Sequence, residues 1–153
     1  KIYFHIIGDG QELDNLKKYA HDNGIQNVIF HGRKPSEEMP RYYTFADAMI
    51  VTLTANPLVS LTLPAKVQSY MAAGKPILAS ANGEIANVIK ESGAGFCAHA
   101  DDDSEFLDIV KLFLNNEERY NMGKNARKYY VNNFSKEIVM DKLEKILIKE
   151  AIY

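Results

Sequence analysis

The stretch IYFHIIGDGQELDNLKKYAHDNGIQNVIFHG, residues 2–32, decides the fold class. It opens with a nearly continuous apolar run from Ile2 to Ile7, which is typical of a strand covered on both faces in a parallel sheet. An amphipathic helix is predicted next, over about residues 11–23, and a second short strand over residues 28–31. No hairpin signal joins the two strands. This order of strand, helix and strand predicts a parallel β-α-β unit.

The rest of the chain continues the alternation. Because strands and helices alternate throughout, we predict an α/β fold: a Rossmann-like, doubly wound parallel sheet flanked by helices, with a helical C-terminal tail. We find no repeat or linker, so residues 1–153 are expected to form a single domain. Further strands are predicted at 49–53, 76–79 and 96–98, and a loop at 54–63. One helix is predicted to begin at either Ser36 or Pro40. Further helices are predicted at 64–73, 84–91, 104–115, 117–132 and 135–150.

Composition narrows the class of protein. With 46% hydrophobic and 25% charged residues, the 153-residue chain is globular. A net charge of −2 argues against a nucleic-acid partner, because proteins that bind nucleic acids normally carry a basic patch. The single Cys97 permits no internal disulfide and fits the cytoplasm. The four histidines show no spacing typical of metal ligands, and no apolar run reaches the roughly 18 residues that span a bilayer.

The chain begins within a predicted strand. Lys1 leads directly into the apolar run, with no helix cap and no signal-peptide cleavage site. We therefore expect the sequence to be a fragment of a longer protein.

The first loop with chemical content is Gly8-Asp9-Gly10. In open parallel sheets, ligands bind outside the carboxyl ends of the strands, and the glycines there let the backbone approach an anion. The third glycine of the dinucleotide fingerprint is missing, because Leu13 stands at its position. A tight turn and a ligand contact both remain open, and the simplest role of Asp9 is to cap the helix.

The second stretch is TLPAKVQSYMAAGKP, residues 62–76. Pro64 at the start of a predicted helix pre-sets the backbone there, and Thr62 is a candidate cap. The free amides of that helix start, together with the ammonium of Lys66, would form a pocket for a diphosphate. Lys66 as an ordinary solvated surface lysine is the alternative interpretation.

These stretches resemble the C-terminal domain of family-four retaining glycosyltransferases, which have the GT-B fold. The glycine and proline after the predicted helix, Gly74 and Pro76, are the most recognisable match. The resemblance covers essentially the whole chain. The branch that works on bacterial surface polysaccharides with amino-sugar donors is the most similar. Further matches, in the order of the family, are Gly8-Asp9-Gly10, Phe30-His31-Gly32, Ala46-Asp47, Gly93-Ala94-Gly95, Met122-Gly123, Ala126-Arg127 and Phe134-Ser135.

The resemblance implies a domain that binds a nucleotide-diphospho-sugar donor, UDP-linked, in a cleft facing an N-terminal acceptor domain of the same protein. The whole enzyme would transfer the sugar to a polysaccharide or lipid-linked acceptor with retention of configuration, without a metal or cofactor. Catalytic residues are left unassigned. The implied donor-binding residues are Gly8 and Gly10 in a cleft loop, Gly32 and Arg33 at the base, Thr62, Leu63, Pro64, Ala65 and Lys66 at the diphosphate and sugar, and Ser69 at the ribose.

Two departures from the family pattern bear on the site. The family often has two glutamates eight positions apart, where this chain has Leu61 and Ser69. The family also places an arginine and a lysine upstream of the segment that begins at Lys1. We therefore expect the first strand, its helix and the acceptor domain to be missing, donor affinity to be weak or undetectable, and transfer to be absent.

Two other classes of protein were weighed. A UDP-sugar 2-epimerase shares the GT-B architecture but needs carboxylates in its cleft, and Glu84 is the one candidate. A non-catalytic doubly wound module, such as a receiver domain, needs an aspartate at the end of the third strand, where Thr52-Leu53-Thr54 stands. For the whole protein we expect a cytoplasmic location, peripheral membrane contact through the missing half, and homodimers formed across an exposed sheet edge.

Some side chains receive a structural interpretation. His5 lies in an apolar strand and is expected to be a packed core histidine. Tyr129, Tyr130 and Phe134 are also expected to pack in the core, as is Phe45. Acidic residues 101–103 precede a predicted helix, where carboxylates stabilise the helix dipole and Ser104 is a candidate cap.

Overall fold

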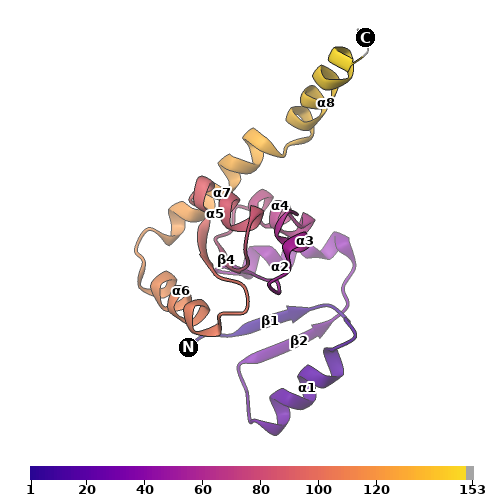
Figure 1. The fold of residues 1–153 in the computed structure, drawn as a ribbon. Helices are drawn as coiled ribbons and strands as arrows, with labels where there is room; N and C mark the ends of the chain where they lie inside the picture. Colours follow the sequence, from indigo (N-terminus) through magenta and orange to yellow (C-terminus); the bar gives the residue numbers. More distant parts are fainter. Residues whose placement is uncertain (151–153) are drawn as a thin grey trace. The chain divides into compact units, whose positions relative to one another are not determined.

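The structure is a computed structural model and describes residues 1–150. Its contacts divide the chain into two compact units, Lys1–Tyr42 and Tyr43–Tyr153, and each unit is described by itself. Figure 1 shows the order of the helices and strands along the chain.

The first unit contains a two-stranded parallel sheet and one helix. Strand β1 (Phe4–Ile7) pairs in parallel with β2 (Val28–Gly32), and α1 (Leu13–Asp22) connects them. A single turn of 3-10 helix, η1 (Ser36–Glu38), follows, and α2 (Met39–Phe45) crosses into the second unit with Pro40 in its first turn. The predicted β-α-β unit is confirmed.

The prediction that the first strand is covered on both faces is wrong within this unit. Ile6 of β1 and Ile29 of β2 each keep 37% of their surface exposed, and His5 is exposed rather than packed in a core. The cause is the small size of the sheet: one ten-residue helix cannot cover both faces of two strands.

The second unit holds a three-stranded parallel sheet in the order β3-β4-β5. Ala79 of β4 lies between Val51 of β3 and Cys97 of β5 in the register. Helices connect each strand to the next, and all three strands run in the same direction. The elements are β3 (Met49–Thr52), α3 (Pro57–Ser60), α4 (Ala65–Ala72), β4 (Ile77–Ser80), α5 (Glu84–Ser92), β5 (Gly95–Ala98), α6 (Asp103–Asn115), α7 (Arg119–Asn133) and α8 (Lys136–Glu150).

All of the strand ladders are parallel, and helices flank them, as the α/β prediction requires. The strands nevertheless form two hydrogen-bonded sheets, one in each unit, where the sequence predicted one. Within residues 1–150, β1 pairs only with β2 and β3 pairs only with β4, so each of these two strands keeps one edge without a partner.

The core of the second unit lies on both faces of β4, all four residues of which are buried. Successive side chains of a strand point to opposite faces, so Ile77 and Ala79 join one cluster while Leu78 joins another. The first cluster includes residues of α4, α5 and α7, and the second includes residues of α6 and Met122 of α7. Helices on both faces of a parallel sheet are the doubly wound arrangement.

A close approach between α7 and the turn after α4 holds α4 in place. A Cβ on Gly123 would collide with the carbonyl oxygen of Gly74, so only glycine fits. One turn further along α7, Arg127 donates from Nη1 to the carbonyl oxygen of Ala72 at 2.6 Å, which caps the C-terminal end of α4. The predicted packing of Tyr129, Tyr130 and Phe134 against the core is confirmed.

Three local predictions are wrong. The predicted loop over 54–63 contains the short helix α3, whose cap is Asn56. Thr62 does not cap α4, because its hydroxyl donates to the carbonyl oxygen of Val59 at 2.8 Å and the N-cap of α4 is Pro64. Phe45 is 77% exposed, since it lies at the C-terminal end of α2 beyond the reach of the core clusters.

Candidate functional site

Two glycines shape the carboxyl ends of the strands in the first unit. The amide of Gly8 donates to the carbonyl oxygen of Gly32 at 2.9 Å, which extends the ladder by one bond. Both residues have a positive φ, 149° for Gly8 and 66° for Gly32, which favours glycine. A Cβ placed on Gly8, Gly10 or Gly32 would meet no atom within 4 Å, so this backbone surface is open to a ligand.

An ion pair joins the two loops at this end of the sheet. Arg33 lies 3.7 Å from Asp9, measured from Nη1 to Oδ2, and both side chains are mostly exposed. Exposed pairs of this kind are weak, so Arg33 can exchange Asp9 for an anionic or polar ligand at little cost. The expectation that Asp9 caps α1 is wrong, because the N-cap is Glu12 and the cap position makes no side-chain hydrogen bond.

A histidine pair lies beside these loops. His5 Nδ1 and His31 Nε2 are 2.8 Å apart and the two rings stack with their centroids 5.1 Å apart. Tyr42 packs edge-on against His31. A direct hydrogen bond between two ring nitrogens needs one donor and one acceptor. This pair was not predicted from the sequence, because His5 was expected to pack in the core.

In the second unit, the N-terminus of α4 presents unpaired backbone donors. Pro64 has no N–H, and the first bond of the helix runs from the amide of Val67 to the carbonyl oxygen of Pro64 at 2.9 Å. Within residues 1–150, the amides of Ala65 and Lys66 have no hydrogen-bond partner, and both residues are exposed. Free amides at a helix start carry the positive end of the helix dipole and favour an anion.

The side chains around this helix start complete the candidate site. Lys66 is exposed, and its ammonium group makes no ion pair within the described part of the chain. Leu63 packs against the core and so anchors the entry to the helix. Ser69 lies one turn along and donates its hydroxyl to the carbonyl oxygen of Ala65 at 3.1 Å.

The start of α5, in the same unit, depends on a glycine that was not predicted from the sequence to matter. Gly83, the N-cap of α5, has a φ of 71°. A Cβ there would collide with the carbonyl oxygen of Ser60, the last residue of α3. Two independent features therefore require glycine at this position: the positive φ and the close approach of α3. Its signal was absent from the sequence because Ser60 lies 23 positions away.

The loop after β5 is tied to the loops after β3 and β4. Asp101 has a φ of 62°, uncommon for a residue other than glycine, and its carboxylate accepts the amide of Ala55 at 2.7 Å. Asn82 accepts the amide of Ala100 at 3.2 Å. These bonds make one connected rim of the loops that follow the three strands.

The first turn of α6 contains the groups with the clearest electrostatic coupling. Asp102, and not Ser104, caps α6 by accepting the amide of Glu105. The His99 ring donates from Nδ1 to the Glu105 carboxylate, and this bond raises the pKa of His99. The His99 backbone amide, which donates to the same carboxylate, lowers the pKa of Glu105. Both side chains are open to solvent, so this pair is a surface feature.

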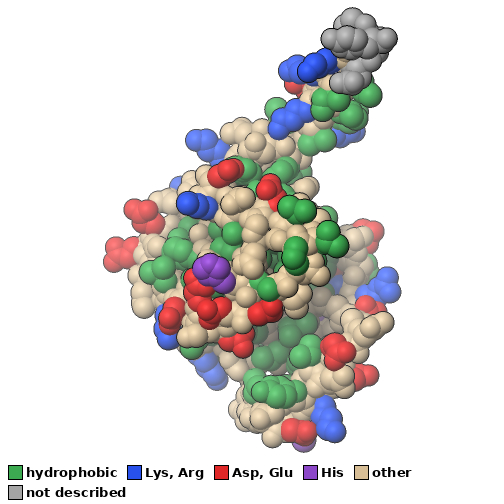
Figure 2. Space-filling view, in the orientation of Figure 1, with side chains coloured by type: hydrophobic (Ala, Val, Ile, Leu, Met, Phe, Trp, Pro, Cys, Tyr) green, Lys and Arg blue, Asp and Glu red, His purple; other side chains and the backbone are tan. Residues whose placement is uncertain are grey.

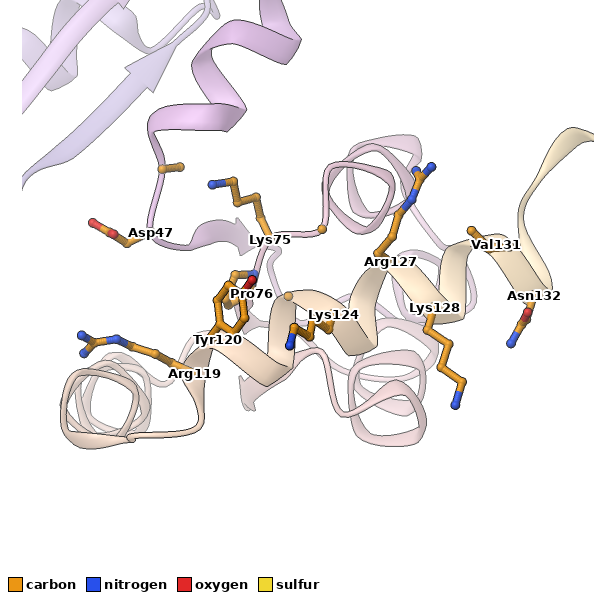
Figure 3. A pocket seen from close by; sticks show the side chains of 13 residues that line it. Asp47, Lys75, Pro76, Arg119, Tyr120, Lys124, Arg127, Lys128, Val131 and Asn132 are labelled. Atoms are coloured by element: carbon orange, nitrogen blue, oxygen red, sulfur yellow. The ribbon is translucent and has the colours of Figure 1, made fainter.

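A basic groove of about 690 Å³ lies at the amino ends of β3 and β4, opposite the helix start of α4. Its cations serve the C-terminal ends of helices: Lys75 donates to the carbonyl oxygen of Thr44 and Arg119 to that of Leu114, each at 3.0 Å. Figure 3 shows Arg127 and Lys128 pointing in opposite directions from α7. Helix capping therefore accounts for Lys75, Arg119 and Arg127, while Lys124 lies over the ring of Tyr120.

The site residues inferred from the sequence thus fall into two groups. The structure brings Gly8, Gly10, Gly32 and Arg33 together in the first unit. In the second unit it brings together Thr62, Leu63, Pro64, Ala65, Lys66 and Ser69 at the start of α4.

This arrangement can be compared with known proteins. A sequence profile of the family described as "Glycosyl transferases group 1" matches residues 1–129. The chain belongs to this family. The match covers both units of the structure, and therefore both groups of site residues.

Curated relatives of this group 1 glycosyltransferase domain carry the same assignment. A probable glycosyltransferase WbjE from Pseudomonas aeruginosa is 31% identical over 148 residues, which cover 93% of this chain and 36% of that protein. A lipopolysaccharide core biosynthesis glycosyltransferase, LpsE from Rhizobium meliloti, is 21% identical and covers 92% of this chain. The chain spans little more than a third of the length of WbjE and 40% of the length of LpsE.

Solved structures show the same GT-B fold. The crystal structure of Anabaena HepE in complex with UDP superposes with a TM-score of 0.83 at 18% identity, over 97% of this chain and 41% of that one. The C-terminal domain of a group 1 glycosyl transferase, LpcC from Francisella tularensis, superposes with a TM-score of 0.63 at 18% identity over 84% of this chain and 66% of that one.

The helices of residues 1–150 were also compared with the requirements of a membrane span. None of them combines the length and the apolar composition that a crossing of the bilayer needs.

Proposed function

We propose that this chain is the donor-binding domain of a longer glycosyltransferase and that the start of α4 holds the diphosphate of a nucleotide-sugar. The observation that carries the proposal is the pair of amides of Ala65 and Lys66, beside the Lys66 ammonium group; among residues 1–150 none of these groups has a partner. A pyrophosphate accepts such hydrogen bonds and gains from the helix dipole. During transfer, the same groups would stabilise the charge that builds up on the departing diphosphate.

The nucleoside is assigned to the remaining candidate residues. In the first unit, Gly8, Gly10, Gly32 and Arg33 are the proposed contacts for the nucleobase; in the second unit, Ser69 is the proposed contact for the ribose. The open backbone at the glycines supports this assignment, because a planar base can approach it closely. UDP is the proposed nucleotide, in keeping with the UDP bound to HepE. The GDP-mannose-dependent mannosyltransferase from Mycobacterium tuberculosis, 25% identical over 146 residues, makes GDP the obvious competitor to test.

The acceptor side of the reaction is assigned to a domain outside this chain. We propose that an N-terminal domain of the same protein supplies the acceptor site. A further segment of the protein outside this chain would supply the missing strand, its helix and the two further cations of the donor site. The acceptor would be a polysaccharide or a lipid-linked sugar. The names of LpsE and of the M. tuberculosis phosphatidylinositol mannoside enzyme support this class of acceptor. We also propose a cytoplasmic enzyme that meets the membrane peripherally.

Exchange of Lys66 for alanine tests the proposed site. Loss of one charge-assisted hydrogen bond is expected to weaken UDP binding by about tenfold, or about 1.4 kcal/mol. The measurement is isothermal titration calorimetry of the chain with UDP, GDP and ADP. Lys90→Ala removes an exposed lysine near the far end of α5 and serves as the matched control.

The outcomes separate the two parts of the proposal. UDP should bind more tightly than GDP and ADP, and only Lys66→Ala should weaken it. If both variants weaken UDP binding equally, Lys66 acts only through the net charge of the chain and does not contact the diphosphate. An unchanged affinity in Lys66→Ala would remove the residue from the donor site.

A further inference from the structure

The basic groove at the amino ends of β3 and β4 carries a surplus of positive charge. Asp47 is the one acidic side chain among the residues that line it. The five cations in the lining are Lys75, Arg119, Lys124, Arg127 and Lys128. None of them makes an ion pair with another residue in the range 1–150. Because the whole chain has a net charge of −2, this positive charge is a local concentration.

Helix ends offset only part of this charge. Lys75, Arg119 and Arg127 donate to carbonyl oxygens at the C-terminal ends of α2, α6 and α4. A helix end of this kind is equivalent to roughly −0.5 elementary charge. Three such ends and the carboxylate of Asp47 therefore leave a surplus of roughly two to three positive charges. The hydrogen bonds hold these cations in place without neutralising them.

Helix α7 supplies most of the surplus. Its sequence over Arg119–Asn133 contains four cations and no acidic residue. Glu117 and Glu118 precede the helix and do not line the groove. Figure 3 shows the cations following one another along the helix from Arg119 to Lys128. An ordinary solvent-exposed helix mixes both signs of charge, so a helix with cations alone indicates an anionic partner.

Uncharged side chains among the cations fit a layer of lipid headgroups. Tyr120 keeps 73% of its surface exposed, and the ammonium group of Lys124 lies 4.5 Å from the centroid of its ring. Val131, on the same side of α7, is also exposed. Tyrosine is enriched where a membrane meets water, because its ring is apolar and its hydroxyl group is polar.

We propose that α7 and the basic groove bind the anionic surface of a membrane. Each Lys or Arg near such a surface strengthens binding about fivefold. The contact is therefore weak by itself and would act together with contacts elsewhere in the protein. The inference extends the proposed peripheral membrane location by naming a surface of this chain, and it does not rest on the donor site.

The spacing of the cations favours many small anions over a single one. Arg119 and Lys128 are nine residues apart on α7, or about 13 Å, so one free phosphate cannot contact both. Nucleic-acid-binding domains usually have a pI above about 9, whereas the pI of this chain is about 6.1. Mobile headgroups can gather beneath whatever cations a protein presents, so they fit a short row of this kind.

The acidic side chains of the second unit gather away from the groove. Figure 2 shows them around a histidine at the start of α6, which follows the carboxyl end of β5. Asp102 and Asp103 are exposed there. The groove lies at the amino ends of the parallel strands, which is the opposite end of the sheet. An anionic surface would therefore meet the groove with little repulsion from these carboxylates.

Co-sedimentation of the chain with lipid vesicles tests the proposal. Vesicles of equal parts of phosphatidylcholine and phosphatidylglycerol should bind the chain, and vesicles of phosphatidylcholine alone should not. Salt at about 0.5 M should release it, because the charges are exposed. Lys124→Gln with Lys128→Gln should weaken binding to the mixed vesicles about twentyfold. The matched control on α1, Lys17→Gln with Lys18→Gln, makes the same change in net charge and should leave binding unchanged.

Titration with UDP and with soluble anions completes the test. Both double variants should bind UDP as the native chain does, so vesicle binding and donor binding can fail separately. An absence of binding to the mixed vesicles, or equal weakening in both double variants, would overturn the proposal. Release of the chain from vesicles by inorganic pyrophosphate at constant ionic strength would also overturn it. So would tighter binding of a DNA duplex that Lys124→Gln with Lys128→Gln weakens in the same way.

Discussion

Replacing Ser69 by glutamate is expected to raise the affinity of the chain for UDP by about tenfold. The native hydroxyl already donates to the carbonyl oxygen of Ala65, so it offers a ribose at most a neutral acceptor. A glutamate at the same place, on the second turn of α4, offers two charged oxygens to the two ribose hydroxyls. The family pattern that this chain resembles often has a glutamate at this position, and Ser69 departs from it.

The control for this gain is a change of ligand. Titration with inorganic pyrophosphate, which has no ribose, should show no gain in Ser69→Glu, because the new carboxylate repels the phosphates. Ser69→Gln, which matches the length without the charge, should give a smaller gain with UDP. An unchanged or reduced affinity for UDP in Ser69→Glu would place the ribose elsewhere.

Replacing Gly83 by alanine is expected to lower the free energy of unfolding of the second unit by about 3 kcal/mol. The backbone angle of 71° strains any residue with a side chain, and the added methyl group collides with the carbonyl oxygen of Ser60. Relief would require α3 and the start of α5 to move apart. Urea unfolding followed by circular dichroism measures the loss.

Gly10→Ala is the matched control for this substitution. Gly10 lacks a positive φ, and a Cβ there meets no atom within 4 Å, so the change should stay within about 0.5 kcal/mol. Equal stability of the two variants would contradict the close approach between α3 and α5.

Elements bracketed by strong local signals were predictable. The helix predicted over 64–73 is α4, Ala65–Ala72, because Pro64 suits only the start of a helix and Gly74 adopts the positive φ that ends one. The strands β3 and β4 were also located to within a residue, since their apolar runs stand between turns. Local chemistry and tertiary structure agree at these places.

The short helix α3 was missed although its signal is visible. Asn56 followed by Pro57 is a capping residue before the preferred first residue of a helix, and the structure uses both in this way. The exposed Leu58 gave no helical periodicity to support them. A four-residue helix is too short for a pattern of buried residues to form.

The parts of the site that were not predictable depend on distant contacts. Gly83 is required because Ser60 lies against it, and the positive φ of Asp101 accompanies a bond to Ala55 on another loop. The pairing of His5 with His31 needs the register of two strands. Such requirements arise only when the sheet has assembled, so neither composition nor spacing reports them.

Nuclear magnetic resonance of the isotope-labelled chain during a titration with UDP tests the central claim most directly, because it observes the backbone amides themselves. The proposed donor site predicts that the amide signals of Ala65 and Lys66 move with the largest shifts in the second unit, as their unpaired N–H groups bind phosphate oxygens. Saturable binding of UDP that leaves these two signals in place while others move would contradict it.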